Sequence, residues 1–388
     1  MNVLILAFAF ELQYSVVRCA RMAGHTVHVL GSGYARGLRY SLSCRSYQRL
    51  ESVPGEARID EIVAEVEMWV RTLRVDAILP SDALSTRFLS AVASRLTVPT
   101  GLLPDPASFD RLNDKAHFSV LCQACGVSTP DTALFDTPAA VSAAIAQKRL
   151  HLPLVVKPRD GMAGEGVLVL RTVADFDGLA QCAYRPLLVQ TFIEGRDRDI
   201  SLLARDGEII AYAVQHRDAA TFDFTDNPQL LAQVRRLIAA EKFTGVAHFD
   251  ARETKDGSFY LIECNPRFWY SIFALAAAGL NMVDLSLQPA HAKHASVRTD
   301  SVTTGIPLLL SLFRNRWPAS SQWMARYYAG DPIGWVCDRG RFFDDARPGA
   351  GGIDAQIERL RRLVSETTRG PFPNAAATLA AGINGPMP

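Results

Sequence analysis

A short turn signal between two apolar-rich runs is the feature that most constrains this chain. Residues 246–265 read VAHFDARETKDGSFYLIECN, and Asp256-Gly257 stands between the two runs, which is typical of a β-hairpin. If these two residues form a two-residue turn, an unbulged ladder puts Asp250 opposite Glu263. Asn265 shares the face of Glu263 because side chains alternate along a strand. The sequence therefore predicts two carboxylates and an amide within cross-strand reach on one face.

These three side chains, Asp250, Glu263 and Asn265, form a candidate metal site. Two carboxylates directly opposite one another destabilise a sheet unless a cation lies between them. Carboxylate and amide oxygens suit Mg²⁺, which commonly keeps substrate phosphates as its other ligands. Arg267 follows two residues later and supplies a fixed cation for a transferring phosphoryl group. The alternative is an edge hairpin with solvated charges.

A glycine-rich loop is predicted between two strands in the segment PLVVKPRDGMAGEGVLVL. The first strand ends at Lys157, and the loop holds Gly161, Gly164 and Gly166. Because glycine lacks a Cβ atom, such a loop can fold over phosphates and present backbone N–H groups to them. A glycine-rich turn without a ligand is the alternative. The order strand–loop–strand differs from the strand–loop–helix of a P-loop.

The segment LLVQTFIEGRDRD supplies a candidate nucleoside site. The backbone of Thr191, Phe192 and Ile193 is placed to hydrogen-bond an adenine edge, and Gln190 offers an amide to the adenine amino group. An acid beyond the turn, Asp197 or Asp199, would take the ribose hydroxyls. Taken alone this signal is weak, because a strand that leads into a charged turn is common in proteins.

Residues 1–100 alternate predicted strands and helices, which indicates an open parallel sheet. Strands are predicted at Val3–Ala7, Thr26–Leu30 and Asp76–Leu79, with helices at Leu12–Ala23, Ile59–Leu73 and Ala83–Arg95. A GxGxxG sequence is absent after the first strand, where FAFELQ stands, so a dinucleotide-binding Rossmann site is not expected. Further along, Leu112–Cys125, with Lys115 in its first turns, and Ser271–Leu287 are predicted as helices.

In combination these motifs resemble the ATP-grasp superfamily, in the branch of carbamoyl phosphate synthetase and biotin carboxylase. The resemblance rests on Lys115, on Lys157 with its glycine loop, on QTFIEGRD, and on the run from Asp250 to Glu263-Cys-Asn265-Pro-Arg267. It covers about residues 1–290. It implies that both lysines contact ATP phosphates, that the Gln190–Ile193 stretch holds adenine, and that Asp197 holds ribose. It also implies that Mg²⁺, with Mn²⁺ as an alternative, binds the hairpin carboxylates and Asn265, and that Arg267 steadies an acyl-phosphate transition state.

The resemblance implies an α/β and α+β architecture: an N-terminal open parallel α/β domain over residues 1–105, a two-lobed ATP-grasp domain over 106–295, and a C-terminal appendage over 296–388. In the appendage a helix is predicted at Asp354–Glu366 and a frayed tail beyond Gly370. Weaker candidates keep two interpretations each. His248 either touches the site or packs beside it. Arg217 either reaches the site or is a solvated loop charge. One of Trp269 and Tyr270 is expected in the core.

The resemblance implies an ATP-dependent carboxylate–amine ligase that forms an acyl phosphate and then an amide. An ATP-binding module without turnover, or a ligase that uses a thiol or bicarbonate, is the alternative. The net charge of +1 argues against nucleic acid and anionic membranes. The resemblance implies small-molecule carboxylates and amines as the partners. Seven scattered cysteines and a start without a basic leader favour the cytoplasm. The oligomeric state is open, with a homodimer among the alternatives.

Overall fold

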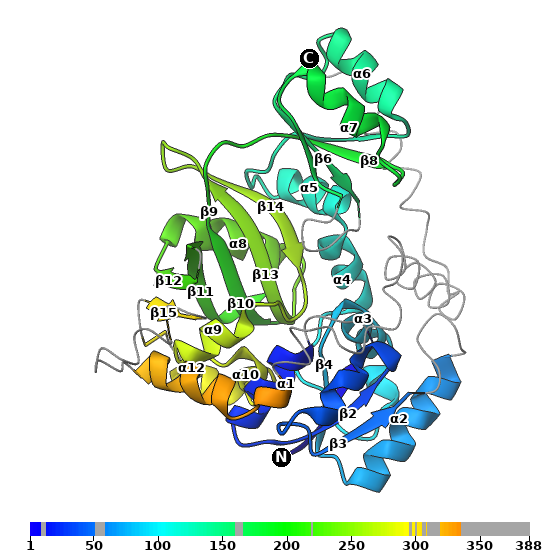
Figure 1. Cartoon of the computed structure of the whole chain (residues 1–388), viewed down its shortest axis with the longest axis vertical. Coiled ribbons are helices and arrows are strands. Elements are labelled where there is room, and N and C mark those ends of the chain that lie inside the picture. The colour runs from blue at the N-terminus through cyan, green and yellow to red at the C-terminus, as the bar shows by residue number, and fades with distance from the viewer. Residues whose placement is uncertain are drawn as a thin grey trace.

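The computed structural model describes residues 1–8, 13–50, 59–159, 166–218, 220–294, 297–298, 301–304, 308 and 319–334. Gly161 and Gly164 of the glycine loop lie outside the described residues, as do the predicted helix Asp354–Glu366 and the tail beyond Gly370. The described chain builds a parallel sheet, a small antiparallel sheet and a larger mainly antiparallel sheet, in that order along the sequence (Figure 1). The mixed α/β and α+β architecture expected from the sequence is confirmed.

The chain begins with a parallel sheet that is covered by helices on both faces. Val3 and Ile5 of the first strand pack with α1, whereas Leu4 and Leu6 pack with α2 and α3, so alternate residues enter two cores. This explains the all-apolar run, because a strand buried on both faces has no polar side. The strands lie in the order β3-β2-β1-β4. Their bounds are β1 Asn2–Ala7, β2 Thr26–Gly31, β3 Ser46–Arg49 and β4 Ala77–Pro80, and those of the helices are α1 Gln13–Met22, η1 Gly33–Tyr40, α2 Ile59–Leu73, α3 Ala83–Val92 and η2 Ala93–Arg95.

A pair of helices replaces the single helix predicted over Leu112–Cys125. Helix α4 spans Pro106–Asn113 and α5 spans Lys115–Ala124, and the chain between them is extended at Asp114. The Asp114 carboxylate accepts from the N–H groups of Ala116 and His117 at 3.0 and 2.9 Å. An aspartate at this position caps the next helix, so the predicted helix is confirmed over Lys115–Ala124, but its start at Leu112 was wrong. The break makes Lys115 the first residue of α5.

The small sheet has the strand order β5-β8-β6-β7. Its inner side chains, such as Val156 and Val189, pack with Val141 of α6 and Leu179 of α7, so the helices occupy one face. The opposite face is left to line the cavity described below. The bounds are β5 Thr132–Phe135, β6 Leu154–Pro158, β7 Leu168–Leu170 and β8 Leu187–Thr191, with α6 Pro138–Ala146, η3 Val173–Asp175 and α7 Phe176–Ala180.

The larger sheet runs in the order β14-β13-β10-β11-β12-β15, and β9 pairs with β13 beside this path. Helix α8, Pro228–Ala240, packs its apolar stripe on one face, where Leu202 and Phe249 are buried. The opposite face carries the polar side chains of the hairpin. The strands are β9 Arg196–Asp197, β10 Asp199–Arg205, β11 Glu208–Asp218, β12 Thr221–Thr225, β13 Gly245–Glu253, β14 Phe259–Asn265 and β15 Ser301–Thr303.

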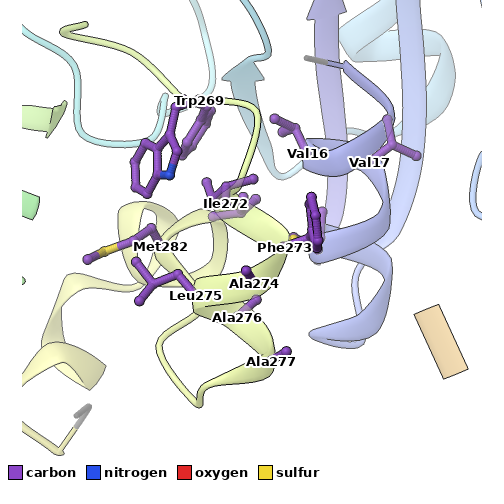
Figure 2. Packing of buried hydrophobic residues seen from close by; sticks show 14 of the residues in the cluster. Val16, Val17, Trp269, Ile272, Phe273, Ala274, Leu275, Ala276, Ala277 and Met282 are labelled. Carbon is purple, nitrogen blue, oxygen red and sulfur yellow. The ribbon is translucent and has the colours of Figure 1, made fainter. Parts of the chain in front are cut away.

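Two short helices stand where one was predicted over Ser271–Leu287. Helix α9 spans Ile272–Ala277 and α10 spans Met282–Leu287. Gly279 lies between them at φ +102°, a left-handed conformation that glycine adopts readily and that ends α9. Figure 2 shows α9 packed beside α1, with Phe273 next to the helix that carries Val16 and Val17, and with Trp269 ahead of α9.

The later segments fold back onto the beginning of the chain. Helix α12, Ala319–Ala329, follows η4, Pro289–His294, and β15. The Arg18 guanidinium donates to the carbonyls of Arg326 and Tyr327 at 2.9 and 2.7 Å, and the buried Asp331 accepts from the Leu42 N–H at 3.0 Å. The divisions at residues 105 and 295 stay predictions. Within the described ranges, no helix is both long and apolar enough to cross a bilayer.

Candidate functional site

A cavity of about 500 Å³ lies between the small sheet and the larger sheet. Its apolar walls include Val155 and Val169 on one side and Ala251 and Ile262 on the other. This apolar slot also holds polar and charged groups, as ligand pockets commonly do. Most of the residues expected at a nucleotide site line it: Lys115, Lys157, Gln190, Thr191, Phe192, Ile193, Asp197, Asp199, Asp250 and Glu263. Gly166, Asn265 and Arg267 are not among the lining residues.

The hairpin β13–β14 places Asp250 opposite Glu263, as the sequence predicted, and it places His248 opposite Asn265. The predicted two-residue turn was wrong, however. The Thr254 N–H bonds the Ser258 carbonyl at 2.9 Å, so three residues form the loop, and Gly257 takes φ +81° there. The longer loop shifts the pairing by one residue, and a bulge at Ile262 shifts it back.

The carboxylate of Glu263 lies between two buried lysines. The Nζ atoms of Lys115 and Lys157 are each 3.6 Å from Glu263 Oε2, although the two come from α5 and β6. Burial lowers the pKa of Lys157, and the charge of Lys115 lowers it further. Burial raises the pKa of Glu263, against the opposite pull of Lys115. A compact site of closely spaced opposite charges of this kind favours an anionic ligand with its own cation.

The cap of α5 explains how Lys115 reaches this place. Asp114, almost wholly buried, holds the start of the helix and also accepts from Arg159 Nε at 2.5 Å. Arg159 stands just after β6 and Lys157. The ion pair therefore ties the elements that carry the two lysines. Sequence reasoning missed this link, because Asp114 and Arg159 are distant in the chain.

Where Gln190 to Ile193 line the cavity, two backbone N–H groups are already engaged within the fold. The N–H groups of Thr191 and Phe192 already donate to the carbonyls of Asp131 and Pro153, at 3.0 and 3.1 Å. Within the described part of the chain, the Ile193 N–H has no such acceptor. Gln190 Nε2 donates to Thr132 Oγ1 at 3.0 Å, which leaves its Oε1 as an acceptor. These two groups match a ring nitrogen and an exocyclic amine.

The two acids proposed for ribose lie in different surroundings. The side chain of Asp197 is 72 % exposed and pairs with Arg252 Nε at 3.0 Å. Asp199 faces the hairpin, with its Oδ2 4.0 Å from His248 Nε2, and burial raises its pKa to about 7. Asp199 therefore belongs to the metal end of the cavity and Asp197 to the other end. Arg252 was missed, yet strand alternation from Asp250 already placed it on this face.

Arg267 is not among the residues that line the cavity, and it is buried beside Asn265 at the end of β14. Its Nη2 donates to Asn265 Oδ1 at 2.8 Å and its Nη1 to the Phe268 carbonyl at 2.9 Å. Burial lowers the pKa of Arg267, while the carboxylates of Glu263 and Asp250 raise it. The guanidinium therefore holds the amide oxygen that was expected to bind metal. Its direct contact with a phosphoryl group stays a prediction.

The structure also places the weaker candidates. Trp269 is 3 % exposed and belongs to the core around α9, whereas Tyr270 is 38 % exposed. Arg217 lines the cavity on β11 and stacks on Phe222 at 5.5 Å. His248 is buried against the metal end and is treated below.

The hairpin donors fit a hard divalent cation. Asp250 and Glu263 face each other across the ladder, so their oxygens can share one ion, and Asn265 lies one row further along. An all-oxygen set of two carboxylates and an amide suits Mg²⁺ or Mn²⁺. The nearby lysines offer positive charge to the phosphates that such an ion would carry.

Comparison with known proteins agrees with this fold. Residues 183–306 match the family model described as ATP-grasp in the biosynthetic pathway with Ter operon. The large chain of the arginine-specific carbamoyl phosphate synthase of Neurospora crassa is 24 % identical over 50 % of this chain. The match spans only 19 % of that relative's length.

Solved structures share the architecture over most of the chain. The L-amino acid ligase of Bacillus licheniformis superposes with a TM-score of 0.57 at 18 % identity, covering 76 % of this chain and 75 % of that one. The biotin carboxylase domain of Hydrogenobacter thermophilus 2-oxoglutarate carboxylase, in complex with MgADP and bicarbonate, gives 0.54 at 13 %, covering 74 % and 69 %. The resemblance to the ATP-grasp superfamily seen in the sequence is therefore confirmed by the family match over residues 183–306, and the solved structures share the fold.

Proposed function

We propose that this protein is an ATP-dependent ligase that activates a carboxylate as an acyl phosphate and joins it to an amine. The observation that carries the proposal is the convergence of Lys115 and Lys157 on Glu263, opposite Asp250, at one end of an apolar slot. Phosphoryl transfer needs little covalent help from protein, so a site that positions and neutralises charge is sufficient.

In the proposed reaction an oxygen of the substrate carboxylate attacks the γ-phosphorus of ATP, and ADP leaves. The amine then attacks the acyl carbon, phosphate departs, and the amine gives up a proton. Lys115 and Lys157 hold the phosphates, while the Ile193 N–H and Gln190 Oε1 hold adenine. Asp197 gives up its ion pair with Arg252 and binds the ribose hydroxyls instead. Mg²⁺ on Asp250, Glu263 and Asn265 would offset the charge of the phosphates.

The MgADP complex of the Hydrogenobacter domain supports ATP and Mg²⁺ as the cofactors. The structural neighbours support a small-molecule substrate, since one is an L-amino acid ligase and another was solved with bicarbonate. We therefore propose amino acids as the first carboxylates and amines to test. A cytoplasmic location and a homodimer remain proposals from the sequence.

The test is a panel of carboxylates with ATP and Mg²⁺, in which hydroxylamine replaces the unknown amine. An acyl phosphate yields a hydroxamate with hydroxylamine, so both hydroxamate and ADP are measured. Substrate-dependent formation of the two in equal amounts supports the ligase. Nucleotide binding without ADP release on any carboxylate, thiol or bicarbonate combination supports a binding module and contradicts the proposal.

A further inference from the structure

The imidazole of His248 lies beside the carboxylate of Asp250 and is fixed from three sides. Its Nε2 is 3.1 Å from Asp250 Oδ1, and its Nδ1 is 2.8 Å from the hydroxyl of the buried Ser201. The indole of Trp269 stacks on the ring, with centroids 5.3 Å apart and planes 9° apart. The ring is therefore held in both its plane and its rotation.

This environment decides which groups donate. An ionised carboxylate only accepts hydrogen bonds, so Nε2 carries a hydrogen toward Asp250. Nδ1 either accepts from the Ser201 hydroxyl or donates to it, and the bond to Asp250 is the same in both protonation states. Asp199 Oδ2 is the other acceptor near Nε2, but at 4.0 Å it lies beyond hydrogen-bond distance. The donor is therefore committed to Asp250.

From this geometry we infer that His248 is a positioning residue that makes Asp250 a one-oxygen ligand and so selects Mg²⁺ against Ca²⁺. The inference rests on the proposed function, in which Asp250 binds the cation. Oδ1 is engaged by Nε2, so Oδ2 is the oxygen that stays available for an ion shared with Glu263, the residue paired with Asp250 across the ladder.

The coordination habits of the two ions give this arrangement its consequence. Mg²⁺ takes near-ideal octahedral geometry at about 2.0–2.1 Å, whereas Ca²⁺ takes about 6–8 oxygens and readily uses both oxygens of one carboxylate. A carboxylate with one oxygen already hydrogen-bonded can still give Mg²⁺ the single ligand that it needs. It cannot give Ca²⁺ both of its oxygens. Groups that orient metal ligands commonly change metal affinity by about 10–100-fold when they are lost.

The order of the side chains that share this face of the larger sheet supports the positioning role of His248. Ser201 pairs with His248 across β10 and β13, and His248 pairs with Asn265 across β13 and β14. Asp250 and Glu263 form the adjacent same-face row. The hydrogen bond between Ser201 and His248 therefore lies directly next to Asp250 and Glu263. Both residues of this bond are held by paired strands and not by a loop.

The experiment measures calorimetric binding of a non-hydrolysable ATP analogue, once with saturating Mg²⁺ and once with saturating Ca²⁺. The ratio of the two dissociation constants is compared for the parent protein and for His248→Leu, His248→Gln and Ser201→Ala. We expect the parent to prefer Mg²⁺, and His248→Leu to reduce the ratio by about tenfold. Glutamine can place an amide N–H near the Nε2 position, so it should keep the ratio within about threefold of the parent.

Ser201→Ala removes only the support of the ring and should give an intermediate ratio. His291→Leu, whose side chain is 59 % exposed and pairs with Asp284 at 3.8 Å, is the control and should leave the ratio unchanged. An unchanged ratio in His248→Leu, or an equal weakening with both ions, overturns the inference and leaves the proposed function standing. If the parent binds the analogue with neither ion, the proposed function itself is contradicted.

Discussion

Lys157 Nζ lies 3.6 Å from Glu263 Oε2, although the two residues come from different sheets on opposite sides of the cavity. The lysine is buried and its pKa is lowered, chiefly by that burial. Binding of a phosphate would restore a counter-charge near it. The contact joins the small sheet to the hairpin at the place where nucleotide phosphates are proposed to bind.

Replacement of Lys157 by alanine should reduce ATP turnover by about 10²–10³-fold, the scale for loss of one preorganised electrostatic group. Lys115→Ala should have a comparable effect, because its Nζ lies at the same distance from Glu263. Steady-state ADP release measures both. Lys255→Ala is the matched control, since that side chain is 90 % exposed. Turnover within about twofold of the parent in either lysine variant would reject its phosphate role.

Glu263→Gln should abolish turnover while the protein stays folded. The amide keeps the size of the side chain but removes the charge that is shared with Asp250 and the lysines. ADP release and circular dichroism are measured together. Glu194→Gln, at a side chain 81 % exposed, should behave as the parent. A folded Glu263→Gln protein that turns over at the parental rate would remove this carboxylate from the site.

Arg267→Ala should lower turnover strongly and change nucleotide affinity little. The guanidinium holds Asn265 Oδ1 and does not line the cavity, so its removal should change the binding of the nucleotide little. Its positive charge is expected to act mainly on the charge that moves during phosphoryl transfer. Lysine should rescue poorly, because it lacks the planar fork that reaches both acceptors. Calorimetry gives the affinity and ADP release the rate. A parallel loss of binding and rate would instead make Arg267 a ground-state clamp.

The contact of His25 with Asp284 predicts a pH dependence of stability. His25 Nε2 lies 3.0 Å from Asp284 Oδ1, and this bond is the largest cause that lowers the pKa of Asp284 below its ordinary value of 3.8. A carboxyl with a lowered pKa stabilises the fold fully above its unfolded pKa, and this contribution is lost as the pH falls through the folded value.

The measurement compares urea unfolding of the parent and of Asp284→Asn at pH 6 and near pH 3. The difference in unfolding free energy should be larger at pH 6 and shrink at the lower pH. Asp136→Asn, at an exposed position, controls for general effects of losing one carboxylate. A difference that is the same at both pH values would show that the ion pair does not contribute through this titration.

The row of Asp250 and Glu263 was predictable because strand alternation and the turn signal are local properties. The loop length was not, because a three-residue loop and a bulge at Ile262 cancel in the register. The sequence pattern alone therefore indicates the final pairing of Asp250 with Glu263, but not the two opposite shifts that produce it. The pairing was therefore predicted correctly from a turn that the structure does not have.

Errors in the helices have a different origin. Asp114 is recognisable in the sequence as a helix cap. However, the helical spacing of apolar residues continues on both sides of it, so the break between α4 and α5 is not apparent. Gly279 hides the break between α9 and α10 in the same way within an apolar run. The pairing of Asp197 with Arg252 requires β9 to meet β13, and no local pattern specifies that contact.

The central claim is that a substrate carboxylate takes the γ-phosphoryl group of ATP. Its most direct test uses a substrate found in the panel, labelled with ¹⁸O in its carboxylate, with mass analysis of the phosphate that is released. An acyl phosphate is cleaved between carbon and oxygen when the amine attacks, so the account predicts one ¹⁸O atom in each phosphate formed. Phosphate that carries no label, released together with ADP and amide, would contradict the account.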